Sequence, residues 1–230
     1  LLTNYEILGS GNKTMLVLHG WRGSSVEWLA FSESFKSKYK IILVDLPGFG
    51  GSHKPDADWG IYEYFEFTKK FLDTMNIKKS VVVGHSFGGR IGILLASRTK
   101  IVERLILIDA AGMEIKSLKT RLIRPLKSVL KYLPSEIKNA FGSTDYKSAG
   151  EMRKIFVKIV NQPLRDELGK INAQTLIVWG EKDKVLSLNE AKMMHLGIKS
   201  SILRIVWGGD HWPHISSLDK LVEILEEEGV

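Results

Sequence analysis

Residues 80–98 read SVVVGHSFGGRIGILLASR, an apolar run followed by a glycine-rich turn and a second apolar stretch. Residues 80–83 predict a buried strand, and Phe87–Arg98 predicts a buried helix. The turn between them has a G-x-S-x-G pattern, Gly84-His85-Ser86-Phe87-Gly88. Its glycines leave room for a sharp strand-to-helix turn that presents Ser86 as a nucleophile. A glycine-rich turn with an incidental serine is the competing interpretation, but the flanking strand and helix favour the catalytic one.

Short apolar and β-branched runs alternate with helical patterns on both sides of this stretch. Strands are predicted at residues 5–8, 15–18, 41–44, 80–83, 105–108, 175–179 and 202–206, and helices at 62–75, 87–98 and 217–227. Most of the predicted strands are nearly continuous apolar runs, as expected for strands covered on both faces. The pattern predicts an α/β fold with a mostly parallel central sheet flanked by helices.

Residues 113–171 interrupt this alternation, because they contain helical patterns and no clear strand. One apolar stripe lies on a basic helix at residues 122–133, and a second runs through Met152, Phe156 and Ile159. We expect a helical cap inserted over the carboxyl edge of the sheet, where open α/β sheets bind ligands. The predicted organisation is a core of residues 1–112 and 172–230 and a cap of residues 113–171.

The amino-acid composition excludes several kinds of functional site. The chain of 230 residues is 44% hydrophobic, enough for one sizeable core. It has no cysteine, which excludes disulfides, a thiol nucleophile and cysteine-ligated metals. No signal peptide or membrane-length apolar run is visible, so we expect a cytoplasmic protein without stable membrane insertion.

The net charge of +7 belongs to the inserted segment, where residues 114–170 hold 13 Lys or Arg against 6 Asp or Glu. No nucleic-acid-binding module accompanies these charges, so no nucleic-acid partner is expected. The basic residues of this segment, Lys127 and Lys131 among them, either bind an acidic substrate group or face solvent.

A serine hydroxyl is a weak nucleophile and needs a base that is itself oriented by a third group. In a fold of this kind the chain order is serine, then acid, then histidine. His195, His211 and His214 follow Ser86 in the chain. His195 lies in a helical pattern, whereas His211 follows the strand at 202–206 through the flexible residues 208–210. We favour His211 as the base, with His214 as the alternative.

Two aspartates at strand ends are candidates for the acid. Asp183 follows the strand at 175–179 in a turn that can direct its carboxylate toward the loop of His211. Asp109 ends the strand at 105–108, and some enzymes of this kind take their acid from that strand. We favour Asp183 and keep Asp109 as the alternative. An ordinary cap or loop hydrogen bond is the competing role for either residue.

Attack by a serine on a carbonyl group forms an oxyanion, which two backbone N–H groups are needed to stabilise. One is expected from Phe87, the residue after the nucleophile. The other is expected from Trp21, in the loop His19-Gly20-Trp21-Arg22-Gly23 that follows the strand at 15–18. The side chains of Trp21 and Phe87 would form apolar walls beside Ser86. His19 precedes the serine in the chain, so we expect it to have a structural role.

Five motifs follow one another along the chain: His19-Gly20-Trp21, Asp45-Leu46-Pro47-Gly48-Phe49-Gly50, Gly84-His85-Ser86-Phe87-Gly88-Gly89, Gly180-Glu181-Lys182-Asp183 and Gly209-Asp210-His211-Trp212-Pro213. Together they resemble the α/β-hydrolase superfamily, especially its small capped bacterial carboxylesterase-like members. The resemblance implies a triad of Ser86, Asp183 and His211, with Trp21 and Phe87 as oxyanion donors. His19, Gly20, Gly84, His85 and Gly88 would support this site. Serine at position 86 departs from the dehalogenase and epoxide-hydrolase branches, which have aspartate there.

The resulting hypothesis is a serine hydrolase that cleaves small carboxylic esters through an acyl-enzyme on Ser86. No cofactor is expected, and no metal either, because His211 and His214 alone make a poor metal site. The same triad also serves hydrolases of carbon–carbon bonds, lactones, amides and peptides. A ligand receptor with little turnover is the alternative from another functional class.

Overall fold

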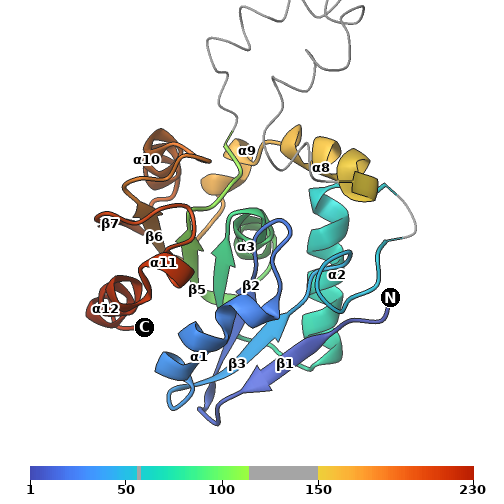
Figure 1. The fold of residues 1–230 in the computed structure, drawn as a ribbon, viewed down its shortest axis with the longest axis horizontal. Helices are drawn as coiled ribbons and strands as arrows, with labels where there is room; N and C mark the ends of the chain where they lie inside the picture. The colour runs from blue at the N-terminus through green and yellow to red at the C-terminus, as the bar shows by residue number, and fades with distance from the viewer. Residues whose placement is uncertain (56–57, 114–149) are drawn as a thin grey trace, which may run out of the picture.

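The computed structural model describes residues 1–55, 58–113 and 150–230. Its centre is a seven-stranded sheet with the strand order β1-β3-β2-β4-β5-β6-β7 (Figure 1). The edge strand β1 runs antiparallel to β3, and every other neighbouring pair of strands is parallel. The strands are β1 (Tyr5–Leu8), β2 (Lys13–Leu18), β3 (Tyr39–Val44), β4 (Ser80–His85), β5 (Val102–Ile108), β6 (Gln174–Gly180) and β7 (Ser201–Val206).

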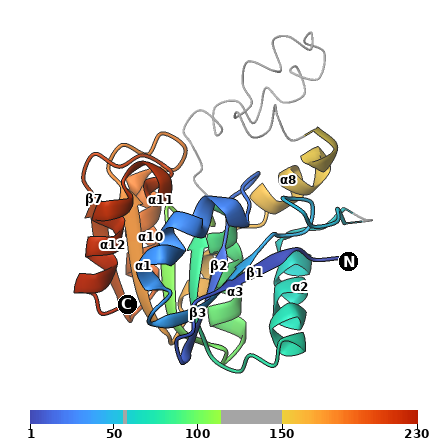
Figure 2. The same ribbon diagram turned by 60° about the horizontal axis from the view of Figure 1, so that its bottom comes forward.

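Helices cover both faces of this sheet (Figure 2). One core contains apolar side chains of α2 (Ile61–Thr74), α3 (Phe87–Arg98), α8 (Arg153–Val160), α9 (Arg165–Leu168) and α10 (Leu188–Gly197). The core on the opposite face contains side chains of α1 (Leu29–Phe35) and α12 (Leu218–Glu227). Successive strand residues alternate between the two cores, as Leu16 and Val17 of β2 do. Both faces are therefore buried, which explains the nearly continuous apolar runs of the inner strands.

All seven predicted strands are present, and the α/β fold with a mostly parallel sheet is confirmed. The predicted strands generally begin too late. The structure starts β5 at Val102 rather than at residue 105, because Val102 and Arg104 pair with Ser80 and Val81 of β4, and Glu103 lies at the register shift between them. Helix α1 and the preceding 3₁₀ turn η1 (Ser25–Trp28) were not predicted. Ser217 is the N-cap residue of α12, but its side chain makes no capping hydrogen bond.

The expected cap is described only in part. The predicted basic helix at 122–133, with Lys127 and Lys131, lies outside the described residues. The described part of the segment begins with the 3₁₀ turn η3 (Gly150–Met152) and continues through α8 and α9. Of the second predicted apolar stripe, Met152 and Ile159 are buried in the core, whereas Phe156 is only half-buried. The division into core and cap stays a prediction.

The parallel strands β2, β4, β5, β6 and β7 end at one edge of the sheet, where their loops meet. This edge carries the predicted residues Ser86, Asp183 and His211 and the loop of Trp21, together with the short helix α11 (Pro213–Ser216). Within the described ranges, every helix is too short or too polar to cross a membrane. A cytoplasmic location stays a prediction.

Candidate active site

Ser86 lies in a sharp turn between β4 and α3, here called the elbow (residues 84–89). Its backbone has φ 48° and ψ −109°, a conformation that is strained for any residue with a side chain. The elbow is crowded by backbone atoms. A Cβ atom on Gly84 would lie 2.7 Å from the carbonyl oxygen of Gly88, and one on Gly88 would lie 2.1 Å from that of Leu18. Both positions therefore require glycine, as the G-x-S-x-G pattern predicted.

His211 bridges Ser86 and Asp183. Its Nε2 atom lies 3.1 Å from the Ser86 hydroxyl oxygen, and its Nδ1 atom lies 2.7 Å from Oδ2 of Asp183. The second oxygen of Asp183 accepts the backbone N–H groups of Val185 and Leu186 at 2.6 and 2.8 Å. The structure thus places the three predicted residues in one hydrogen-bonded row, although they come from three different loops.

The charge state of Asp183 follows from these contacts. Burial acts to raise the pKa of this carboxyl, but the hydrogen bond and charge of His211 act against burial. The N–H groups of Val185 and Leu186 add to their effect, and the pKa of Asp183 falls below its ordinary value. Asp183 is therefore a carboxylate at neutral pH, and a carboxylate can hold the Nδ1–H tautomer of His211 and stabilise its protonated ring.

Two segments, here called the paired loops, position His211 and Asp183: residues 180–186 after β6 and residues 207–214 after β7. The N–H of Lys182 donates to the carbonyl of Gly209 at 2.8 Å, and the N–H of Gly208 donates to Oε2 of Glu181 at 2.9 Å. A Cβ atom on Gly180 would lie 2.1 Å from the carbonyl oxygen of Asp210. The close contact of the two loops sets the distance between the acid and the base.

The carboxyl group of Asp109, the alternative acid, lies beside Asp183 and His211. Its Oδ1 atom accepts the N–H of Gly180 at 2.9 Å. One oxygen of Asp109, one of Asp183 and one ring nitrogen of His211 all lie within 4.8 Å of one another. This spacing is short enough for a shared metal ion. The 2.7 Å contact between His211 and Asp183, however, is an ordinary hydrogen bond that a metal would replace. The structure places Asp183, the favoured candidate, against the Nδ1 atom of His211.

The two other candidate histidines lie away from the serine. His195 is exposed on α10, where its Nδ1 atom lies 2.9 Å from the hydroxyl of Ser201. His214 is buried in α11 and stacks on Trp28, with ring centroids 4.1 Å apart. Neither ring nitrogen of His214 has a hydrogen-bond partner among the described residues. Of the three candidates, His211 is the one that contacts Ser86.

His85 and His19 hold the backbone around the site. The Nε2–H of His85 donates to the carbonyl of His211 at 2.7 Å, a contact that the sequence did not predict. His19 donates through Nδ1 to the carbonyl of Gly20 at 2.7 Å and accepts the N–H of Leu46 at Nε2, 2.9 Å away. Burial lowers the pKa of His85 well below its ordinary range and that of His19 to about 4. Both rings are therefore neutral, as these hydrogen bonds require.

The loop after β2 lies directly beside the serine. A Cβ atom on Gly20 would be 2.7 Å from Nδ1 of His85 and 3.5 Å from Cβ of Ser86. The hydrogen bonds between backbone groups outside helices and strands do not use the N–H of Trp21 or Phe87, within the part of the chain that the structure describes. Their role as oxyanion donors stays a prediction.

Aromatic side chains form a wall around Trp21, whose loop lies beside Ser86. The Trp21 ring contacts the rings of Phe49, Phe87 and Phe156 at centroid distances of 4.9, 5.4 and 5.0 Å. Trp21 and Phe87 were predicted to form this wall. Phe49 and Phe156 were not, because they come from distant segments. Phe156 belongs to α8, so the described part of the inserted segment contributes to the site.

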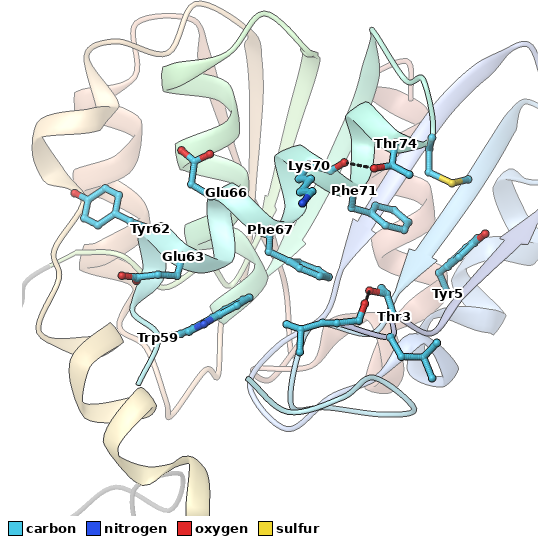
Figure 3. A pocket seen from close by; sticks show the side chains of 13 residues that line it. Thr3, Tyr5, Trp59, Tyr62, Glu63, Glu66, Phe67, Lys70, Phe71 and Thr74 are labelled. Atoms are coloured by element: carbon cyan, nitrogen blue, oxygen red, sulfur yellow. Dashed lines mark hydrogen bonds between the residues drawn. The ribbon is translucent and has the colours of Figure 1, made fainter. Parts of the chain in front are cut away.

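A cavity of about 900 Å³ lies elsewhere, between α2 and the N-terminal residues (Figure 3). Trp59, Phe67 and Phe71 line it together with Thr3 and Tyr5. None of the residues that line this cavity belongs to the elbow or the paired loops. It is separate from the candidate active site.

Comparisons with known proteins agree with this architecture. Residues 13–121 match the family model described as alpha/beta hydrolase fold. Lipase 1 of Psychrobacter immobilis is 27% identical in an alignment that covers 91% of this chain and 74% of the lipase. The crystal structure of a membrane phospholipase A, described as a bacterial virulence factor, has a TM-score of 0.81 and 27% identity over 98% of this chain and 81% of that one. The structure of an esterase from Exiguobacterium antarcticum has a TM-score of 0.78 and 22% sequence identity. The match covers 98% of this chain and 94% of the esterase.

Proposed function

Because the chain has the α/β-hydrolase fold and belongs to that superfamily, we propose that it is a serine hydrolase that cleaves carboxylic esters. The observation that carries this proposal is the row in which His211 lies 3.1 Å from the Ser86 hydroxyl and 2.7 Å from the Asp183 carboxylate. This is the geometry expected of a nucleophile, its base and the acid that orients the base.

The reaction follows from the positions of these groups. The Ser86 oxygen attacks the ester carbonyl while its proton moves to Nε2 of His211. The N–H groups of Trp21 and Phe87 stabilise the resulting oxyanion, and Asp183 stabilises the protonated His211. Collapse of the tetrahedral intermediate breaks the bond to the alcohol, which leaves with the proton from His211. Water, deprotonated by His211, then attacks the acyl-enzyme and releases the carboxylic acid and free Ser86.

Two observations support an ester as the substrate. Similar proteins are described as a lipase, a phospholipase A and an esterase, and all three names denote ester hydrolases. In the aromatic wall, Trp21 and Phe156 are partly exposed, and they pack against the buried rings of Phe49 and Phe87 to give an apolar surface. Such a surface suits an acyl chain or an aromatic group better than a charged one.

The test compares wild type with Ser86→Ala on the p-nitrophenyl esters of acetate, butyrate and octanoate. We expect kcat to fall roughly a million-fold in Ser86→Ala, the size of loss known for nucleophiles of this type. Ser34→Ala, a substitution at an exposed serine of α1, is the matched control and should retain full activity. A fluorophosphonate should label wild type and not Ser86→Ala. Labelling of Ser86 without turnover of any ester would contradict the ester assignment, and equal turnover by both proteins would contradict the serine mechanism.

A further inference from the structure

Asp109 is a buried carboxyl for which the mechanism above has no use. It follows β5 with a backbone φ of 41°, a left-handed conformation that aspartate tolerates better than most residues, and its side chain is fully buried. Its two oxygens differ. Oδ1 accepts the N–H of Gly180 at 2.9 Å, whereas Oδ2 is buried without a hydrogen-bond partner among the described residues. A buried polar atom without a partner is unusual enough to need an explanation.

The groups around Asp109 disfavour a second negative charge. Asp183 comes from the loop after β6, and Asp210 and His211 come from the loop after β7. The adjacent strand β4 ends in His85, which burial keeps neutral. Burial, followed by the nearby Asp183, raises the pKa of Asp109 well above its ordinary value, although the Gly180 N–H acts in the opposite direction. Like charges this close repel, so the ionisation of one carboxyl favours a proton on the other.

Asp183 is the ionised member of the pair, because His211 and two backbone N–H groups stabilise its charge. The proton therefore belongs to Asp109. A neutral carboxylic acid accepts at its carbonyl oxygen and donates from its hydroxyl. This pattern matches the structure, in which Oδ1 accepts from Gly180 and Oδ2 lacks a partner.

We propose that Asp109 is a positioning residue of the active site, a neutral carboxylic acid that accepts the Gly180 N–H and donates its Oδ2–H to the Asp183 carboxylate. The proposal rests on the proposed function of Asp183 and His211. The two hydrogen bonds link the end of β5 to the turn after β6 and fix the direction of the Asp183 carboxylate. They also spread its charge, which reduces the stabilisation of protonated His211 in the resting enzyme.

Two substitutions separate this role from its alternatives. Asp109→Asn keeps an acceptor at Oδ1 and supplies an N–H donor in place of the Oδ2–H. We expect its kcat, its KM and the acidic limb of its pH profile for kcat/KM to resemble those of wild type. Asp109→Gly suits the backbone conformation but removes both hydrogen bonds. We expect kcat to fall about 10- to 100-fold, as for a lost hydrogen bond to a charged group, with little change in KM.

The titration of His211 gives a readout that needs no turnover. In Asp109→Gly the charge of Asp183 is no longer shared, so the pKa of His211 measured by ¹⁵N NMR should rise, and in Asp109→Asn it should stay at the wild-type value. Infrared difference spectra of wild type minus Asp109→Asn should contain the carbonyl band of a protonated carboxylic acid. If wild type hydrolyses no ester, the proposed function fails, but these two spectra still decide the state of Asp109.

Three outcomes would overturn the proposal. A lower pKa of His211 in Asp109→Asn would show that wild-type Asp109 is ionised. The absence of the carboxylic acid band would show the same. An Asp109→Gly protein with unchanged kcat and unchanged His211 titration would leave Asp109 with a structural role alone. If Asp109→Gly does not fold, Asp109→Asn and the infrared band decide the matter without it.

Discussion

The elbow and the paired loops meet at one edge of the sheet, but different forces hold them. The elbow is held by backbone atoms packed so closely that Gly84 and Gly88 tolerate no Cβ. Its strand, turn and helix are contiguous in the chain. The paired loops also pack closely, at Gly180 against Asp210, but they are held in addition by hydrogen bonds to side chains, such as those from Gly208 to Glu181 and from Gly180 to Asp109. These bonds join strands β5, β6 and β7, which are far apart in the sequence.

The two regions therefore have different roles in the site. The elbow presents Ser86 in a strained conformation through its own backbone packing at Gly84 and Gly88. The paired loops determine whether that serine meets a base, because His211 and Asp183 reach it only when the two loops dock. Substitutions in either region should therefore lower activity, but they should differ in their effects on folding stability and on its pH dependence.

The largest expected effect tests whether the two regions act as one unit. Ser86→Ala and His211→Ala should each lower kcat roughly a million-fold, and the double variant should lose little more, because one proton transfer needs both groups. The measurement is kcat for octanoate or butyrate p-nitrophenyl esters. Ser34→Ala combined with His195→Ala, both exposed positions, is the control. A His211→Ala protein with a near wild-type rate would contradict the claim that the elbow and the paired loops act as one unit.

The next effect isolates the acid in the paired loops. Asp183→Asn should lower kcat about 10⁴-fold, because an amide no longer stabilises the protonated His211 and favours the wrong tautomer. Asp210→Asn is the matched control. Asp210 accepts hydrogen bonds from the Trp212 N–H and the Ser216 hydroxyl, which asparagine can still accept, and neither bond involves Ser86, His211 or Asp183. Similar losses in the two variants would mean that loop structure, and not the charge of Asp183, determines the rate.

The same contrast explains what the sequence could predict. The elbow was predictable because its strand, glycines and helix are adjacent, and the apolar pattern of each strand indicated the parallel sheet. The choice between Asp109 and Asp183 was harder, since both follow strands and both end beside His211. Which one takes the hydrogen bond depends on how the loops dock. Phe156 in the aromatic wall and the stacking of His214 on Trp28 depend on long-range packing that no local pattern encodes.

A smaller loss of activity should follow from separating the paired loops. In Gly180→Ala the new Cβ would meet the carbonyl oxygen of Asp210 at 2.1 Å, so one loop must move. A shift of about 1 Å in the base or the acid is expected to cost roughly 100-fold in kcat/KM. Gly169→Ala is the control, because a Cβ added there would have open space around it. Wild-type kcat/KM in Gly180→Ala would show that the paired loops tolerate a wider separation than proposed.

The smallest expected effect concerns stability, and it distinguishes the two regions by their response to acid. Burial lowers the pKa of His214 to about 3 in the folded protein, from an ordinary value of 6.5. Between these two pH values, His214 is protonated in the unfolded chain and neutral in the folded one. Folding stability is therefore lost as the pH falls from 6.5 toward 3. His214→Phe keeps an apolar ring against Trp28 and removes no hydrogen bond between described groups. Relative to wild type, its free energy of unfolding should gain roughly 2 kcal/mol between about pH 8 and about pH 5.

Urea unfolding at the two pH values measures this gain, and His53→Phe, at an exposed histidine, should show none. Activity at the higher pH should stay near that of wild type, because His214 does not contact Ser86. A stability difference that is the same at both pH values would mean that His214 takes up its proton in the folded state. The paired loops would then hold a charge behind His211, and their acid sensitivity would have to come from Asp183, whose lowered pKa also ties stability to its ionised form. The elbow has no titrating group on which folding depends in this way, apart from His85, whose hydrogen bond to the carbonyl of His211 ties it to the paired loops.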